Sequence, residues 1–242
     1  MRALRIAALA ALAAAATLVA PAEAGQSQCN NKTATIVGTD GDDRLTGTSG
    51  TDVIAAHGGD DIVAGAGGED FICGGLGDDT LKGGSGDDHL NGNKGGDSLR
   101  GGDGDDNLNG SGGNDTLLGG LDCDRLRAGS GSDHLGTGGV TGYCSGDTLV
   151  GGSGVDTFDI GEDGAVIRAG SGDETIQGSS ARDEIDAGGG DDRVYGGAGP
   201  DFLRGQFGDD YLDGEGGRDE IYGNRGTDEC HSGETRTSTC EN

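Results

Sequence analysis

The chain has 242 residues, 56 of them glycine, and carries a formal net charge of −28 at pH 7. Aromatic residues make up only 3%, which excludes the usual core of an ordinary globular domain, and low hydrophobicity with high net charge is typical of disorder. With 44 acidic side chains against 16 basic ones, the composition argues against nucleic-acid and anionic-membrane binding, and it favours hard cations, chiefly Ca²⁺.

The N-terminus has the three parts of a secretory signal peptide. Arg2 and Arg5 form a basic start, residues 6–20 are apolar, and small residues follow where a signal peptidase reads the chain. We therefore expect residues 1–24 to be removed by cleavage after Ala24 and the protein to be secreted into the extracellular space. A membrane anchor is the alternative, but the apolar run is shorter than the roughly 20 residues that span a bilayer.

Residues 25–37 come next and are expected to cap the N-terminal end of the fold. Ile36 lies nine residues before Leu45, the first of a long series of isolated apolar residues with the same spacing. A repeat at a fixed short period indicates a solenoid, whose terminal unit needs a cap because it lacks one neighbour.

The first run of nine-residue units covers residues 38–136 and contains 11 units. Glycine occupies the first, second and fourth positions of most units, and an apolar residue occupies the eighth. The sixth position of every unit is an aspartate: Asp43, Asp52, Asp61, Asp70, Asp79, Asp88, Asp97, Asp106, Asp115, Asp124 and Asp133.

A phase break at residues 137–141 separates this run from a second one, residues 142–231, which contains ten units. Two units of the second run depart from the pattern, with Ala165 and Glu174 at the sixth position. A C-terminal tail, residues 232–242, follows. The aspartates of the second run are Asp147, Asp156, Asp183, Asp192, Asp201, Asp210, Asp219 and Asp228.

Each unit predicts a turn of six residues followed by a strand of three. Glycine adopts backbone angles that other residues avoid, so the turn can be tight. The last three residues, with one apolar residue in the middle, fit a short strand with one buried side chain. Two units would complete a coil of 18 residues, and successive coils would stack as parallel strands with the apolar residues inside.

This pattern resembles the RTX (repeats-in-toxin, haemolysin-type) calcium-binding nonapeptide repeat family; residues 74–82 and 83–91 are the clearest copies. The resemblance implies an all-β fold, a right-handed parallel β-roll or β-solenoid with calcium in its turns. It also implies that the sixth-position aspartates and backbone carbonyls bind multiple Ca²⁺ ions, with ligands shared between turns one coil apart. A disordered Gly/Asp-rich tail is the alternative, but random low-complexity sequence does not hold a nine-residue phase this long.

Six cysteines in an exported protein indicate disulfide bonds, with unpaired thiols as the alternative. A Cys230–Cys240 bridge would tie down the last coil, and a Cys123–Cys144 bridge would join the two runs across the phase break. A Cys29–Cys73 bridge follows by elimination.

Several units have a second acid directly before the sixth-position aspartate, and we interpret these acids as solvated surface charge. They are Asp42, Asp60, Asp78, Asp87, Asp105, Asp191 and Asp209. The sequence contains no H-E-x-x-H, G-x-S-x-G or P-loop motif, and its four histidines are spread over three different repeat positions. No catalytic residues are therefore expected.

The favoured hypothesis is a monomeric, non-enzymatic, secreted calcium-binding protein that folds when it binds Ca²⁺ outside the cell. A structural or adhesive protein of the cell surface or matrix, in which calcium serves folding alone, is the second hypothesis. The third, an enzyme acting on an acidic polysaccharide, has no set of catalytic side chains to support it.

Overall fold

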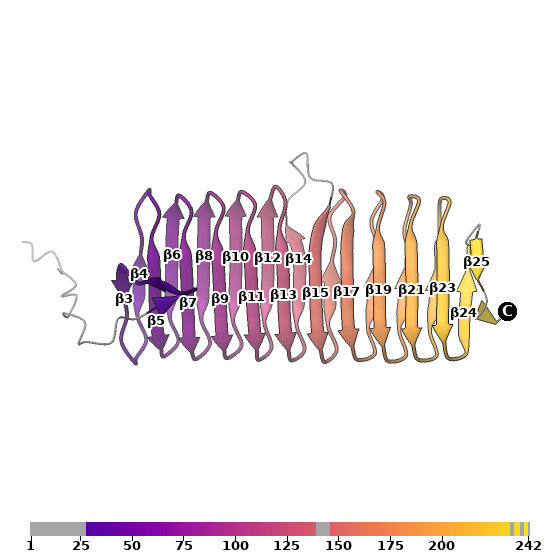
Figure 1. Cartoon of the computed structure of the whole chain (residues 1–242), viewed down its shortest axis with the longest axis horizontal. Helices are drawn as coiled ribbons and strands as arrows, with labels where there is room; N and C mark the ends of the chain where they lie inside the picture. Colours follow the sequence, from indigo (N-terminus) through magenta and orange to yellow (C-terminus); the bar gives the residue numbers. More distant parts are fainter. Residues whose placement is uncertain (1–27, 139–145, 233–234, 238–239, 242) are drawn as a thin grey trace, which may run out of the picture.

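The computed structural model describes residues 28–138, 146–232, 235–237 and 240–241. These residues form one elongated stack of coils in which strands run alternately along two faces (Figure 1). All of the regular structure assigned to them is β-strand. No helix long and apolar enough to cross a membrane was found among them.

Two parallel sheets make up the faces of the stack, and we call them the even sheet and the odd sheet after their strand numbers. The even sheet contains β4 (Arg44–Thr46), β6 (Ile62–Gly67), β8 (Thr80–Ser85), β10 (Ser98–Asp103), β12 (Thr116–Leu121), β14 (His134–Gly138), β16 (Thr157–Asp159), β18 (Thr175–Gln177), β20 (Arg193–Tyr195), β22 (Tyr211–Asp213), β24 (Asp228–His231) and β26 (Cys240–Glu241). The odd sheet contains β3 (Ile36–Val37), β5 (Val53–Gly58), β7 (Phe71–Leu76), β9 (His89–Lys94), β11 (Asn107–Gly112), β13 (Arg125–Ser130), β15 (Asp147–Ser153), β17 (Ala165–Ser171), β19 (Glu184–Gly189), β21 (Phe202–Phe207), β23 (Glu220–Arg225) and β25 (Thr235–Thr237).

Neighbouring strands of a sheet are in most cases 18 residues apart in sequence. Leu99 of β10 pairs with Leu81 of β8 and with Leu117 of β12, all in parallel register. One coil therefore consists of two nonapeptide units, one strand in each sheet. The predicted all-β parallel β-roll is confirmed.

Many strands are longer than the predicted three residues. β8 runs through the first three residues of the following unit, where Gly84 pairs with Gly102 of β10. Glycines one coil apart lie opposite each other, so their backbone groups can continue the ladder into what the sequence suggested was turn.

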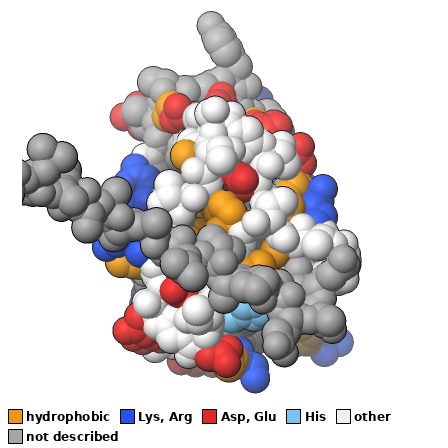
Figure 2. All heavy atoms as spheres, turned by 90° about the vertical axis from the view of Figure 1, so that its left-hand side faces the viewer, with side chains coloured by type: hydrophobic (Ala, Val, Ile, Leu, Met, Phe, Trp, Pro, Cys, Tyr) orange, Lys and Arg blue, Asp and Glu red, His pale blue; other side chains and the backbone are white. Residues whose placement is uncertain are grey.

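The eighth-position side chains of both sheets point inward and form one continuous apolar core along the roll. Leu81, Leu108 and Leu126 are completely buried, and the same core cluster extends along the roll as far as Cys230. At the N-terminal end, hydrophobic side chains lie in the middle of the coil while acidic ones gather toward the turn edges (Figure 2). Burying a Leu side chain contributes about 1.5–3 kcal/mol, so this narrow core supplies only part of the stability of a conventional domain.

The phase break does not interrupt the roll. Leu126 of β13 pairs with Leu149 of β15, and Leu135 of β14 pairs with Phe158 of β16. Each step spans 23 residues instead of 18, and both sheets continue across the break in parallel register. The two repeat runs therefore form one continuous β-roll.

Both ends are covalently fastened. Cys230 is bridged to Cys240, and Cys29 to Cys73, with Cα–Cα separations of 5.5 and 5.6 Å. These two predicted disulfides are confirmed. The predicted Cys123–Cys144 bridge involves Cys144, which lies outside the described residues.

A short antiparallel hairpin, β1 (Gln28–Cys29) and β2 (Lys32–Thr33), lies against the odd sheet near its N-terminal end (Figure 1). Its two loop residues, Asn30 and Asn31, have positive φ angles of 50° and 63°, which is typical of a type I′ turn. The Cys29–Cys73 bridge joins this hairpin to β7.

Candidate calcium-binding turns

The sixth-position aspartates form two columns, one along each turn edge of the roll. In each column the backbone NH of one aspartate donates to Oδ1 of the aspartate one coil later; for example, Asp79 NH donates to Asp97 Oδ1 at 2.8 Å. The first column contains Asp43, Asp61, Asp79, Asp97, Asp115, Asp133, Asp156, Glu174, Asp192, Asp210 and Asp228. The second contains Asp52, Asp70, Asp88, Asp106, Asp124 and Asp147, then Ala165, Asp183, Asp201 and Asp219.

The other carboxylate oxygen, Oδ2, has a different environment. In most of these aspartates it is buried inside the turn and has no hydrogen-bond partner among the described residues. These are Asp61, Asp70, Asp79, Asp88, Asp97, Asp106, Asp115, Asp124, Asp133, Asp156, Asp192, Asp201, Asp210 and Asp219. A buried carboxylate oxygen without a partner is costly, so each one marks a position where a positive charge would stabilise the fold.

Burial also changes the acidity of these groups. Desolvation raises the pKa of Asp124 to about 8 and the pKa values of Asp97 and Asp106 to about 7. The backbone NH group donated from one coil earlier opposes the shift, and neighbouring carboxylates add to it. At neutral pH the columns therefore hold carboxyl groups that resist ionisation unless a cation compensates them.

The surrounding donors are of the kind that Ca²⁺ prefers. At Gly74 an added Cβ would collide with Oδ2 of Asp79, and it would lie 3.0 Å from the carbonyl oxygen of Gly92 one coil on. Among the described residues no three His, Cys, Asp or Glu side chains converge on one point. A cation in these turns would therefore be coordinated largely by backbone carbonyls, and a carboxylate with several carbonyls is a normal ligand set for Ca²⁺, which takes 6–8 oxygens.

Comparison with known proteins agrees with this geometry. The family model of the RTX calcium-binding nonapeptide repeat matches residues 37–72, 74–99, 100–135, 168–203 and 195–230. The chain belongs to the RTX calcium-binding repeat family. A search of curated proteins found no match to this chain.

The RTX match leaves residues 136–167 uncovered, the part that contains the phase break and the unit with Ala165. One contact in the described part of this region lies outside the columns: the NH of Gly161 donates to the hydroxyl of the buried Thr137 at 2.8 Å. The NH of Ala165 still makes the usual column bond, to Asp183 Oδ1 at 2.7 Å. Ala165 supplies no carboxylate, so the second RTX column is interrupted at this coil.

Three sixth-position aspartates are set apart by hydroxyl groups. Oδ2 of Asp43 accepts bonds from the NH and hydroxyl of Thr39, at 2.6 and 2.9 Å. Asp52 accepts the same pair from Thr48 at the same distances, and Asp183 accepts the pair from Ser179 at 2.7 and 2.9 Å. We call residues 39–43, 48–52 and 179–183 the hydroxyl-closed turns. In each of these turns the Oδ2 atom of the aspartate already has two donors within the turn.

The backbone of the hydroxyl-closed turns also differs from that of other RTX turns. Elsewhere the second and fourth positions of a unit commonly have positive φ, as at Ala66 (91°) and Gly68 (100°). Thr48 and Gly50, which hold the same two positions one coil earlier, do not have positive φ angles. The fourth position of the third hydroxyl-closed turn is Ala181, which also lacks a positive φ. Side-chain bonding and turn conformation therefore change together.

Two further groups of acids contribute to the turns. Glu174 replaces aspartate in the first column, is 1% exposed, and has its pKa raised to about 8, chiefly by desolvation. The acids that precede the sixth position are exposed, as expected, but they also accept backbone NH groups from the next coil. Asp60, for example, accepts the NH of Asp78 at 2.9 Å, and the others in this group are Asp42, Asp78, Asp87, Asp105, Asp191 and Asp209.

Proposed function

We propose that this protein is a secreted, non-enzymatic calcium-binding protein whose β-roll folds as it takes up multiple Ca²⁺ ions in the extracellular space. The two columns of buried carboxylates carry the proposal, because their Oδ2 atoms face the inside of the turn without a hydrogen-bond partner among the described residues. Bound calcium would supply the positive charge that these oxygens need.

The proposed ligands are Oδ2 atoms together with backbone carbonyls of turns one coil apart. Within the first column they are Asp61, Asp79, Asp97, Asp115, Asp133, Asp156, Asp192 and Asp210, and within the second they are Asp70, Asp88, Asp106, Asp124, Asp201 and Asp219. Asp147 and Asp228 hold the same positions in the columns and complete the set. We leave Asp43, Asp52 and Asp183 out, because local donors already occupy their Oδ2 atoms.

Folding and calcium binding are expected to be a single event. Without calcium at neutral pH, ionised carboxylates one coil apart would repel one another inside a thin roll that has little apolar core, and the chain would favour the unfolded state. The complete sites exist only when coils are stacked, so binding energy becomes folding energy.

The cellular location follows from two observations. The N-terminal pattern of residues 1–24 is that of a secretory signal, and the Cys29–Cys73 and Cys230–Cys240 bridges are typical of an oxidising compartment. Extracellular calcium is millimolar, which suits extracellular modules with dissociation constants of roughly 10⁻⁴ to 10⁻³ M.

Circular dichroism of the secreted chain, with its disulfides intact, tests the proposal. We expect titration with Ca²⁺ to produce a sharp, cooperative gain of β signal, and Mg²⁺ to produce little, because Mg²⁺ demands a smaller octahedral site and gives up its waters reluctantly. A chain that is fully folded in chelator at neutral pH would contradict calcium-driven folding. It would indicate that the apolar core and the disulfides are sufficient to fold the chain without calcium.

A further inference from the structure

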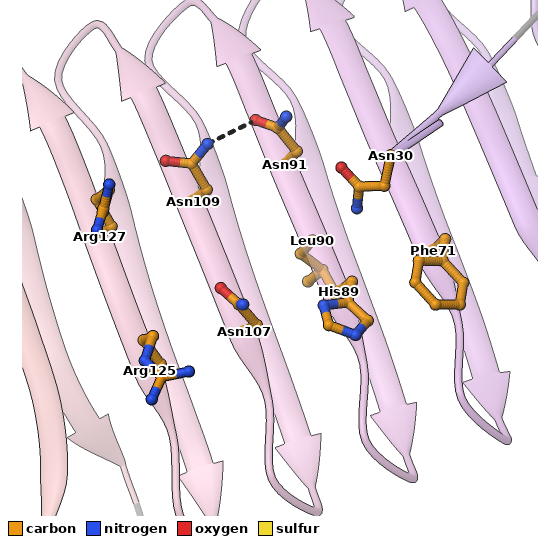
Figure 3. A pocket seen from close by; sticks show the side chains of 9 residues that line it. All are labelled: Asn30, Phe71, His89, Leu90, Asn91, Asn107, Asn109, Arg125 and Arg127. Carbon is orange, nitrogen blue, oxygen red and sulfur yellow. Dashed lines mark hydrogen bonds between the residues drawn. The ribbon is translucent and has the colours of Figure 1, made fainter. Parts of the chain in front are cut away.

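A groove on the odd sheet is separate from the turn edges. Its volume is about 510 Å³, within the range of small-ligand sites, and its lining comes from the β1–β2 hairpin and four neighbouring strands (Figure 3). The lining residues are Asn30, Phe71, His89, Leu90, Asn91, Asn107, Asn109, Arg125 and Arg127.

The floor and sides of the groove follow directly from the strand register. His89 pairs with Phe71 and Asn107, and Asn107 pairs in turn with Arg125. Parallel strands lie about 4.8 Å apart, so the row from Phe71 to Arg125 extends roughly 14 Å across the sheet. A second row, two residues further along each strand, contains Asn91, Asn109 and Arg127.

One end of the groove is aromatic and rigid. The rings of Phe71 and His89 are stacked, with centroids 4.7 Å apart and an interplanar angle of 15°. The ammonium group of Lys32 lies 3.9 Å from the centroid of the Phe71 ring. The Cys29–Cys73 bridge fixes this hairpin to the sheet. The His89 ring is therefore held in place by its stacking on Phe71 and is available to a ligand in the groove.

The middle of the groove is lined by amides. The side-chain NH₂ of Asn109 donates to Oδ1 of Asn91 at 3.3 Å and to the hydroxyl of Ser111 at 2.9 Å (Figure 3). Asn107 makes no side-chain hydrogen bond with any described residue. Amides both donate and accept, so this surface suits a ligand with many hydroxyl groups.

The other end carries two arginines. Within the described part of the chain, the guanidinium groups of Arg125 and Arg127 form neither an ion pair nor a hydrogen bond. No acidic residue lies on β7, β9, β11 or β13, so no carboxylate of these strands competes for the two guanidinium groups. Arginine binds a carboxylate in a two-pronged fashion, so the pair forms an anion-binding end.

We infer that this groove binds a carboxylate-bearing oligosaccharide. The two arginines bind the carboxylate, the asparagines bind ring hydroxyls, and the His89 ring packs against the apolar face of a sugar. A nucleic acid fits less well, because its many phosphates would meet the acidic turn edges on both sides of this narrow sheet.

The probe we would use is a hyaluronan hexasaccharide, titrated by calorimetry into the protein in saturating calcium. Its carboxyl-reduced form is the ligand control, since it keeps the rings and loses the charge. The double variant R125Q/R127Q removes two groove charges. The matched variant K82Q/R100Q removes two charges from exposed, paired positions on the even sheet. Circular dichroism verifies that each protein is folded, so the outcome is independent of how much calcium folding needs.

We expect the hexasaccharide to bind the wild type and K82Q/R100Q equally, and to bind R125Q/R127Q at least about tenfold more weakly, the loss of one to two charge-assisted hydrogen bonds. The carboxyl-reduced form should lose a similar factor on the wild type. No binding by the wild type would overturn the inference. An equal loss of affinity in R125Q/R127Q and K82Q/R100Q would also overturn it. Equal affinity of the wild type for the native and the carboxyl-reduced hexasaccharide would do the same, and this comparison does not depend on the folding of any variant.

Discussion

Thr48 donates its backbone NH and its hydroxyl to the same oxygen, Oδ2 of Asp52, at 2.6 and 2.9 Å. One coil later the equivalent residue is Ala66, and Oδ2 of Asp70 is buried without a partner among the described residues. The Oδ2 atoms of adjacent turns in one column thus have two different environments. Oδ2 of Asp52 is hydrogen-bonded within its own turn, whereas Oδ2 of Asp70 is left in a position that suits a cation.

Replacing Thr48 by valine should lower stability without changing the amount of bound calcium. The variant loses one hydroxyl-to-carboxylate bond, which contributes about 1.5–3 kcal/mol to the free energy of unfolding. Chemical denaturation in saturating calcium measures that loss, and equilibrium dialysis measures the ions bound. Thr80→Val, on the partly exposed side of β8, is the control and should change stability by no more than about 0.5 kcal/mol. A lower ion count in Thr48→Val would show that Asp52 is a calcium ligand after all.

Alanine should be tolerated at Gly50 and harmful at Gly68, although the two glycines occupy the same repeat position one coil apart. At Gly50 an added Cβ would meet nothing closer than the Thr48 hydroxyl at 4.0 Å, and φ is not positive. At Gly68 φ is 100°, and the Cβ would lie 2.7 Å from the carbonyl carbon of Gly50. We expect Gly68→Ala to cost about 1–2 kcal/mol or more and Gly50→Ala to be neutral or slightly stabilising, from thermal midpoints in saturating calcium. Equal changes of the thermal midpoint in Gly50→Ala and Gly68→Ala would contradict the distinction between the two kinds of turn.

Asp97→Asn should have opposite effects with and without calcium. Asparagine can still accept the Asp79 NH through its side-chain oxygen, but it removes a buried negative charge whose pKa is raised to about 7. In chelator the variant should have more β structure than the wild type at pH 7.5. In calcium it should need a higher concentration for half-maximal folding and fold less cooperatively. Asp103→Asn, an exposed aspartate in the following unit, is the charge-matched control and should resemble the wild type in both titrations.

In chelator the roll should become more stable as the pH falls from 8 to 5. The pKa of Asp124 is raised to about 8, and those of Asp97 and Asp106 to about 7, in the folded state, above their unfolded values near 4. Between these limits the folded chain binds more protons than the unfolded chain, so stability is lost as the pH rises through the folded pKa values. Below about pH 4 both states are protonated and the gain ends.

The β signal of the chelated protein, followed from pH 8 to 4, measures this dependence. Asp124→Asn should make it shallower, because one strongly shifted group is gone, and this variant separates the buried columns from the general drop in net charge. Calcium should reverse the trend, since protons compete with the ion for the same oxygens. A chelated chain that is more stable at pH 8 than at pH 5 would be inconsistent with carboxylate burial.

The nine-residue phase by itself predicted stacked coils and the positions of the two aspartate columns, and the resemblance to the RTX family implied the β-roll. The reason is geometric: two units close one coil, so residues such as Leu81 and Leu99, 18 apart, must lie side by side, and a periodic sequence specifies a periodic stack. The register through the phase break was not determined in this way. It depends on which residues pair on the two sides of the break, and the pairing of Leu126 with Leu149 decided it.

Tertiary structure also decided which side chains satisfy one another. Ser111 is a hydroxyl residue at the second position of its unit, like Thr48 and Ser179, yet it has a φ of 83° and bonds to Asn91 and Asn109 instead of closing its own turn. Sequence position alone could not separate these cases, because the hydroxyl chooses between its own aspartate and the neighbouring coil. The groove between Phe71 and Arg125 has the same origin, because side chains from four repeat units form one surface only when the coils are stacked.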